Sequence, residues 1–243
     1  MSETPLVWSE PFRIRAVETG PDGMASVLTV CDLLQEAAGE HALAADREGF
    51  PLPDGGWSTW VLSQLSVRIG RRPAMREIVE VETWPAALDG LRATRDFRVT
   101  DADGAVLAVA TSRWFLIDID RRRPVRLPPA MDGFEAGAKP RAHEMPDPPR
   151  APDPVEHRAE FAVRRSDLDR VGHANNVRFI EWALEALPAD AGLAGIDVAY
   201  KAEANVGDVV VSAVGPLRDG ARDHRLAARD GRTFALARTL WSR

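Results

Sequence analysis

The sequence predicts an α+β fold in which one long helix, wrapped by a curved antiparallel sheet, occurs twice in tandem. A helical pattern with strand-like runs on either side fills residues 12–119, and a proline-rich stretch follows at 121–156. The first pattern then begins again at Phe161. With 243 residues, of which 45% are hydrophobic, the chain is long enough to bury a core in each half.

The first half is predicted to contain a strand, a helix and four further strands. Residues 12–18 alternate apolar and polar side chains as a strand does, and a turn follows at 22–24. Apolar residues then recur at helical spacing through 28–46, before glycines and prolines at 49–55 break the chain. Four strand-like runs separated by turn residues predict a meander. They span residues 60–69, 78–84, 91–100 and 105–119.

The second half repeats the order of elements and turns of the first half. An ungapped match pairs Phe161 with Phe12, Gly172 with Gly23, Ala174 with Ala25, Glu185 with Glu36 and Ala186 with Ala37. The later strand-like runs align in the same order, which favours a duplication over chance. We therefore expect a first repeat at 1–120, a linker at 121–156 and a second repeat at 157–243.

The stretch 166–188 runs from a polar loop directly into an amphipathic helix. Its polar residues are Asp167, Asp169, His173, Asn175 and Asn176. One predicted helical face consists of Val177, Ile180, Leu184 and Leu187. Either asparagine can accept a hydrogen bond from the first turn, and Pro188 is expected to end the helix. Backbone N–H groups left unpaired at this helix start would suit the polarisation of a carbonyl group.

Charge and cysteine content exclude several classes of protein. The net charge of −6, from 31 basic and 37 acidic residues, argues against a general surface for nucleic acid or for anionic membranes. The sequence shows neither a signal-like start nor the roughly 18 consecutive apolar residues of a membrane helix, so we expect a cytoplasmic protein. The single cysteine, Cys31, excludes an internal disulfide and a cysteine metal cluster, and its helical context predicts a core residue.

Several spaced motifs together resemble the acyl-acyl carrier protein thioesterase family, and in particular the bacterial relatives of the plant fatty acyl thioesterases. The motifs are DLDRVGHANN at 167–176, QEAAGEHA at 35–42, TW at 83–84 and SRW at 112–114. The resemblance extends from about Phe12 to Trp241. It implies a double hotdog fold and the hydrolysis of fatty acyl thioesters of acyl carrier protein to free fatty acid and the carrier thiol, without a metal or other cofactor.

The resemblance also implies a catalytic set of Asp169, His173 and Glu203. Glu203 would be the base that activates water, or a nucleophile, while Asp169 would help to hold the site and His173 would orient or hydrogen-bond the substrate. The family pattern D-x-N-x-H has asparagine where this chain has Val171, and the family's cysteine position after the glutamate is Ala204. Without the resemblance, Asp167 and Asp169 are typical of turn or capping residues.

Val171 cannot form a side-chain hydrogen bond, so one polar contact to the thioester or to water would be missing. The loss of one such donor costs on the order of 3 kcal/mol of transition-state stabilisation. The activity is then weakened, supported instead by Asn175 or Asn176, or absent. We therefore count Val171, Asn175 and Asn176 among the substrate-binding positions.

The first repeat is expected to have another task. Met24 stands in the place of His173 and Arg72 in that of Glu203, which predicts one chemical site per chain. Small residues in the first helix could leave room for an acyl chain, and Gln35 or Glu36 could reach the site, although ordinary helix packing explains the same residues. Arginines around 68–76 and 121–126 could bind the acidic carrier protein, although solvated strand edges are the plainer explanation.

Three other functions stay open. An acyl-coenzyme A thioesterase would keep the fold and the reaction. A non-catalytic acyl-thioester-binding protein would explain Val171, and a hydratase on the same fold fits the helix-start pattern less well. The acyl carrier protein is the expected partner. Two fused repeats can mimic a dimer of single hotdog domains, and a homodimer through sheet edges or helices also stays open.

Overall fold

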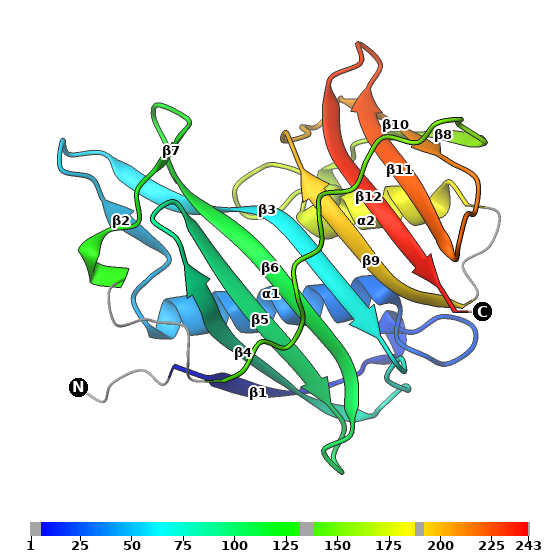
Figure 1. Ribbon diagram of the computed structural model, residues 1–243, viewed down its shortest axis with the longest axis horizontal. Coiled ribbons are helices and arrows are strands. Elements are labelled where there is room, and N and C mark those ends of the chain that lie inside the picture. The colour runs from blue at the N-terminus through cyan, green and yellow to red at the C-terminus, as the bar shows by residue number, and fades with distance from the viewer. Residues whose placement is uncertain (1–5, 132–138, 188–191, 243) are drawn as a thin grey trace. The chain divides into compact units, whose positions relative to one another are not determined.

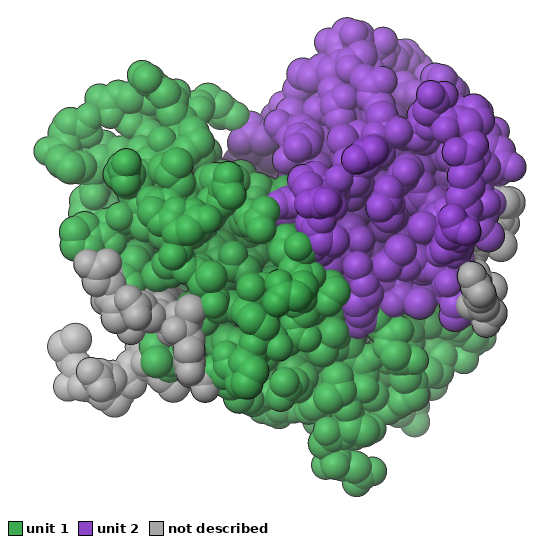
Figure 2. Space-filling view, in the orientation of Figure 1, with its two compact units in different colours: residues 1–63, 69–145 green, residues 64–68, 146–243 purple. Residues whose placement is uncertain are grey.

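The computed structural model describes residues 6–131, 139–187 and 192–242. The chain divides into two compact units, residues 1–63 with 69–145 and residues 64–68 with 146–243, coloured green and purple in Figure 2. Among the described residues, each unit contains one α-helix and one set of antiparallel strands (Figure 1). None of the helices in the described residues is long and apolar enough to cross a membrane.

The first unit contains helix α1 (Val27–Ala44) and the strands that cover it. The strands are β1 (Trp8–Arg13), β2 (Gly49–Pro51), β3 (Trp57–Ile69), β4 (Ile78–Leu88), β5 (Arg92–Thr100), β6 (Val106–Asp118) and β7 (Arg123–Val125), of which residues 64–68 belong to the second unit. Two short 3-10 helices are η1 (Ala16–Glu18) and η2 (Pro129–Met131). The strand order is β1-β4-β5-β6-β3, with β2 on β3 and β7 on β6.

Helix α1 begins close to its predicted start. The hydroxyl of Ser26 caps the helix by accepting a hydrogen bond of 3.0 Å from the N–H of Thr29. Most of the apolar face predicted from helical spacing is buried, including Val30 and Leu34, whereas Leu28 is half-buried; Cys31 on the same helix is buried as well. Burial raises the pKa of the Cys31 thiol to about 12, so this thiol is a core group and not a nucleophile.

Two expectations for the first half are wrong in part. The strand predicted at 12–18 occupies Trp8–Arg13, and Ala16–Glu18 form a 3-10 turn because the Glu18 carboxylate accepts the N–H of Arg15 at 2.6 Å. The predicted four-stranded meander holds only for β4, β5 and β6. Strand β3 lies beside β6, and the free edge of β4 is taken by β1.

The second unit contains helix α2 (Asn176–Glu185), the 3-10 helix η3 (Arg165–Asp167) and five strands of its own. These are β8 (His157–Ala162), β9 (Leu193–Tyr200), β10 (Val209–Val214), β11 (Ala221–Ala228) and β12 (Thr233–Trp241). Residues 64–68 of β3 pair with β9, and the order continues β9-β12-β11-β10-β8. The residues buried from α2 are Val177, Phe179, Ile180, Trp182 and Ala183, so the buried face differs from the predicted one at Leu184 and Leu187. Pro188, the predicted helix stop, lies outside the described residues.

One pair of equivalent backbone hydrogen bonds relates the loops of the two repeats. In the first unit the N–H of Ala25 bonds the carbonyl of Pro73 at 2.7 Å, and in the second unit the N–H of Ala174 bonds the carbonyl of Ala204 at 2.9 Å. The residue before each carbonyl is therefore equivalent, which matches Arg72 with Glu203.

The predicted linker contains some regular structure. Residues 121–156 include β7 and η2, and the chain passes from the first unit to the second between Met145 and Pro146. Within the first unit, the guanidinium of Arg141 holds this segment on the sheet through an ion pair of 2.8 Å with the buried Asp96.

The core of the second unit contains a histidine that makes stability depend on pH. Burial lowers the pKa of His224 to about 4, and its Nε2 lies 2.9 Å from Oγ1 of Thr239. The unfolded chain takes up the proton near pH 6.5 and the folded chain only near 4. As the pH is lowered from 6.5 to 4, the free energy of unfolding should therefore fall by on the order of 3 kcal/mol. Thermal unfolding of wild type and His224→Gln from pH 7 to 4 tests this. The wild type should lose stability more steeply, while the half-exposed His157→Gln control should follow the wild type; parallel curves for all three would contradict the expectation.

Candidate active site

Two loops of the second unit meet at the start of α2. One loop, residues 163–175, precedes the helix, and the other, residues 201–208, joins β9 to β10. The hydrogen bond from Ala174 to Ala204 ties the loops together. It brings Nε2 of His173 to 3.4 Å from Oε2 of Glu203, with 29% and 36% of the two side chains exposed. A histidine and a carboxylate therefore face each other within reach of water.

Asp169 shapes the turn that presents His173. Its Oδ1 accepts the N–H of Val171 at 2.8 Å and that of Gly172 at 3.1 Å, and its own N–H bonds the carbonyl of His173 at 2.9 Å. Gly172 has a φ of +94°, a backbone conformation that residues other than glycine rarely adopt. Asp169 thus acts on the backbone of the loop.

Asp167 anchors the same loop through its buried carboxylate and its backbone carbonyl. Its buried carboxylate accepts the N–H of Arg164 at 2.7 Å and pairs with the Arg164 guanidinium at 3.1 Å. Its carbonyl accepts the N–H of Asn175 at 2.8 Å. This residue therefore caps η3 with its side chain, as turn chemistry predicts, and links η3 to the N-cap of α2 with its carbonyl.

The start of α2 differs from the prediction of unpaired backbone N–H groups. Oδ1 of Asn175 accepts the N–H of Val177 at 2.9 Å, and the Asn175 carbonyl accepts the N–H of Arg178, also at 2.9 Å. These two amides are satisfied because Asn175 is the N-cap. Asn176 is the first helical residue, and its carbonyl accepts the hydroxyl of Tyr200 at 3.2 Å.

Val171 lies on the outside of the turn, with 66% of the residue exposed. The pairing of Gly23 with Gly172 makes Asp22 its equivalent in the first unit. The carboxylate of Asp22 forms an ion pair with Arg72, which is the equivalent of Glu203. A side chain at the position of Val171 can therefore reach the position of Glu203 in this loop geometry.

Two polar residues of the first unit, which is the predicted acyl side, are Gln35 and Arg95. Gln35 lies half-buried on α1, and its predicted role at the site stays a prediction. Arg95 lies on the face of β5 that turns to the helix, where its guanidinium is 3.0 Å from Nδ1 of His41 and 3.1 Å from Oγ1 of Thr83. Burial lowers the pKa of Arg95 to about 10. The strand alternation that places Arg95 with Phe97 could have indicated this inward cation.

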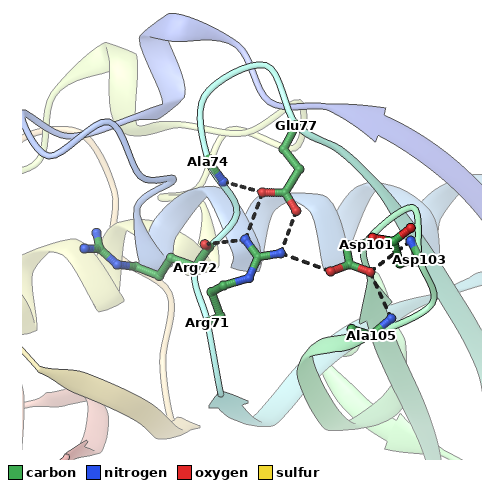
Figure 3. Close-up of polar contacts among 7 residues, drawn as sticks. All are labelled: Arg71, Arg72, Ala74, Glu77, Asp101, Asp103 and Ala105. Carbon is green, nitrogen blue, oxygen red and sulfur yellow. Dashed lines mark hydrogen bonds and ion pairs between the residues drawn. The ribbon is translucent and has the colours of Figure 1, made fainter.

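Several of the arginines considered for carrier binding are paired within the units. In Figure 3, Arg71 contacts the Glu77 carboxylate at 2.9 and 2.7 Å and Asp101 at 3.2 Å, which raises the pKa of Arg71 above its usual range. Arg68 pairs with Asp197 at 2.6 Å. Paired guanidinium groups attract an acidic partner less strongly, so these contacts favour the plainer explanation of solvated strand edges.

The described residues contain no group of three or more histidine, cysteine, aspartate or glutamate side chains placed to hold a metal ion.

The duplicated unit of one helix and an antiparallel sheet places the chain among the hotdog thioester hydrolases. Residues 5–132 match the family model of the acyl-ACP thioesterase N-terminal domain, and residues 151–243 match that of the C-terminal domain. The chain belongs to the acyl-ACP thioesterase family.

Individual relatives agree over nearly the whole chain. The chloroplastic oleoyl-acyl carrier protein thioesterase of Coriandrum sativum is 30% identical over 97% of this chain and 72% of the relative. The structure of an acyl-ACP thioesterase from Bacteroides thetaiotaomicron superposes with a TM-score of 0.87 at 24% identity, covering 100% of both chains. The 12:0-ACP thioesterase of Umbellularia californica has a TM-score of 0.84 at 25% identity, covering 98% of this chain and 94% of that one. The chain spans 61% to 72% of the length of the curated relatives.

Proposed function

We propose that the chain hydrolyses fatty acyl-acyl carrier protein thioesters to free fatty acid and the carrier thiol, with Glu203 as the base. The observation that carries this proposal is the distance of 3.4 Å between Nε2 of His173 and Oε2 of Glu203, on side chains that water can reach. Membership of the family and the names of its relatives support the acyl carrier protein as the source of the acyl group.

The reaction needs an activated water, stabilisation of an oxyanion and a protonated leaving group. Glu203 takes a proton from water, whose oxygen attacks the thioester carbon. The tetrahedral intermediate then collapses, the C–S bond breaks, and Glu203 donates the proton to the leaving thiolate. His173 orients the water or donates a hydrogen bond to the thioester oxygen.

The loop residues around this pair act on its geometry. Asp169 holds the turn in which His173 lies, through its bonds to the N–H groups of Val171 and Gly172. The positive end of the α2 dipole lies at Asn176 and favours negative charge on the thioester oxygen. Because Asn175 already occupies the N–H groups of Val177 and Arg178, this contribution comes from the dipole and less from direct donation.

The first unit is the proposed acyl side of the protein. Its equivalent positions carry Met24 and Arg72, so it lacks the histidine–glutamate pair. Ala37 and Ala38 are buried on the face of α1, where a larger side chain would take up the space available to an acyl chain.

The carrier is tested by comparing acyl carrier protein and coenzyme A thioesters at equal acyl chain. We expect kcat/KM to be at least tenfold higher for the carrier protein across a series of chain lengths, because a protein carrier adds contacts outside the acyl pocket. Thiol release measured with a chromogenic thiol reagent follows both substrates. Equal values for the two carriers, or a preference for coenzyme A, would contradict the carrier assignment while leaving thioester hydrolysis in place.

A second candidate function is the binding of an acyl thioester without turnover, and the observation that favours it is Val171. The apolar side chain at this position leaves the loop without the amide that the family pattern has beside the catalytic set. This function predicts retention of an intact acyl thioester through gel filtration, with no release of thiol above background.

A further inference from the structure

The loop that carries Glu203 has no regular structure of its own. Residues 201–208 are held by backbone contacts at one end, where the N–H groups of Lys201 and Ala202 bond the carbonyl of Phe234 at 2.7 and 3.1 Å. The Ala174–Ala204 bond holds the middle. The position of the Glu203 backbone therefore depends on what restrains the rest of the loop.

Arg232, in the turn between β11 and β12, restrains this loop from a second direction. Its Nη1 donates a hydrogen bond of 3.3 Å to the carbonyl of Glu203, and its Nη2 lies 3.7 Å from Oδ2 of Asp208. The guanidinium carbon lies 4.7 Å from the centre of the Phe234 ring. One planar group thus contacts the backbone of the candidate base, the far end of its loop and the ring beneath them.

Asp208 completes the restraint. Its Oδ2 also accepts the N–H of Asn205 at 2.9 Å, and its carbonyl accepts the N–H of Val163 at 2.9 Å. Arg232 therefore contacts a carboxylate that is itself tied to the loop, so that a displacement of either residue would be transmitted to Glu203.

The first repeat contains a corresponding restraint, in which the cation belongs to the loop. There the N–H groups of Gly70 and Arg71 bond the carbonyl of Leu107 at 2.9 and 3.2 Å, as those of Lys201 and Ala202 bond Phe234. The N–H of Ala74 bonds the Glu77 carboxylate at 2.7 Å, as that of Asn205 bonds Asp208. Arg71 is thus the equivalent of Ala202, and Glu77 that of Asp208.

In the first repeat the cation comes from the loop, and in the second it comes from the hairpin turn. Arg71 bridges Glu77 on its own loop and Asp101 on the β5–β6 turn (Figure 3). In the second repeat Ala202 leaves the loop without that cation, and Arg232 supplies it from the β11–β12 turn. Both repeats therefore tie this loop to this turn, and only the second carries a glutamate at the tied position.

We propose that Arg232 is a positioning residue that holds the Glu203 loop in the geometry needed for hydrolysis. This inference rests on the proposed function of Glu203. Its effect acts through the Glu203 carbonyl and Asp208, so it should change the rate of the chemical step more than the binding of the acyl chain.

The test compares Arg232→Gln and Arg232→Lys with Arg238→Gln in the full chain. Arg238 is a matched control, because it also forms a half-exposed ion pair in the second unit, at 2.8 Å with Asp223, without contacting the Glu203 loop. The kcat for acyl carrier protein thioesters is expressed per folded molecule, with the folded fraction taken from circular dichroism. We expect Arg232→Gln to lower kcat about tenfold with KM within twofold of wild type, since displacements of about 1 Å can cost up to 100-fold in rate.

The remaining outcomes separate positioning from stability. Arg232→Lys should recover only part of kcat, because its single ammonium group can replace one of the two nitrogen contacts, and Arg238→Gln should keep the wild-type kcat per folded molecule. A wild-type kcat for Arg232→Gln, or an equal loss in Arg238→Gln, would overturn the inference. Wild-type protein without hydrolysis would instead contradict the proposed function, so the two failures are distinguishable.

Discussion

Replacement of Glu203 by alanine is expected to lower kcat for thioester hydrolysis by about three orders of magnitude. A positioned general base contributes about 10²- to 10⁴-fold, and Glu203 is the carboxylate that faces His173. Glu203→Gln should be as slow as Glu203→Ala. The amide can keep a hydrogen bond to His173, but it cannot take a proton from water, and the proton transfer is what the reaction needs. Thiol release from acyl carrier protein substrates of graded chain length measures the effect.

The control for this experiment is Glu185→Gln, which removes an exposed carboxylate at the end of α2 and should leave kcat unchanged. Circular dichroism establishes that each variant is folded. If wild type and Glu203→Ala release thiol at the same background rate, the assignment of Glu203 as the base is wrong.

Replacement of Val171 by asparagine is expected to raise kcat by tenfold to about 100-fold. The added amide would supply a hydrogen-bonding group beside the His173–Glu203 pair, and one such group contributes up to on the order of 3 kcal/mol to transition-state stabilisation. The ion pair of Asp22 with Arg72 supports this expectation, because it joins the equivalent two positions in the first repeat. With 66% of Val171 exposed, the change should cost little stability.

Two further variants make the Val171 experiment decisive. Val171→Ala should show no gain, since it alters size without adding a hydrogen bond, and the gain of Val171→Asn should vanish in combination with Glu203→Ala. An unchanged rate in Val171→Asn would mean that another group already makes the contact or that the position has a different role. A wild type that retains intact acyl thioester, with turnover only in Val171→Asn, would support the binding function instead.

Local sequence signals predicted the elements near the site because they depend on neighbours in the chain. Helical spacing placed the first helix at 28–46, and the structure has it at Val27–Ala44. Asn175 was expected as a possible cap and is the N-cap of α2. The alternation at 12–18 predicted a strand where Ala16–Glu18 form a 3-10 turn, because the capping contact between Arg15 and Glu18 outweighs the strand pattern there.

The partners of the polar groups could not be predicted in the same way. The N–H groups of Val177 and Arg178 were expected to be unpaired, but the cap residue occupies them. Arg95 contacts His41, which is 54 positions away in the chain, and Arg232 contacts the carbonyl of Glu203, which is 29 positions away. Such contacts depend on how strands pair, which alternation alone does not encode.

The sequence by itself therefore determined the duplication, the two helices and the polar loop that contains His173, since each is a periodic or short-range pattern. Its resemblance to the family also pointed to Glu203. Only the tertiary structure decided that β3 lies beside β6 and that Arg232 contacts the Glu203 loop. These features arise from hydrogen bonds between distant segments, whose geometry is fixed when the sheet closes around each helix.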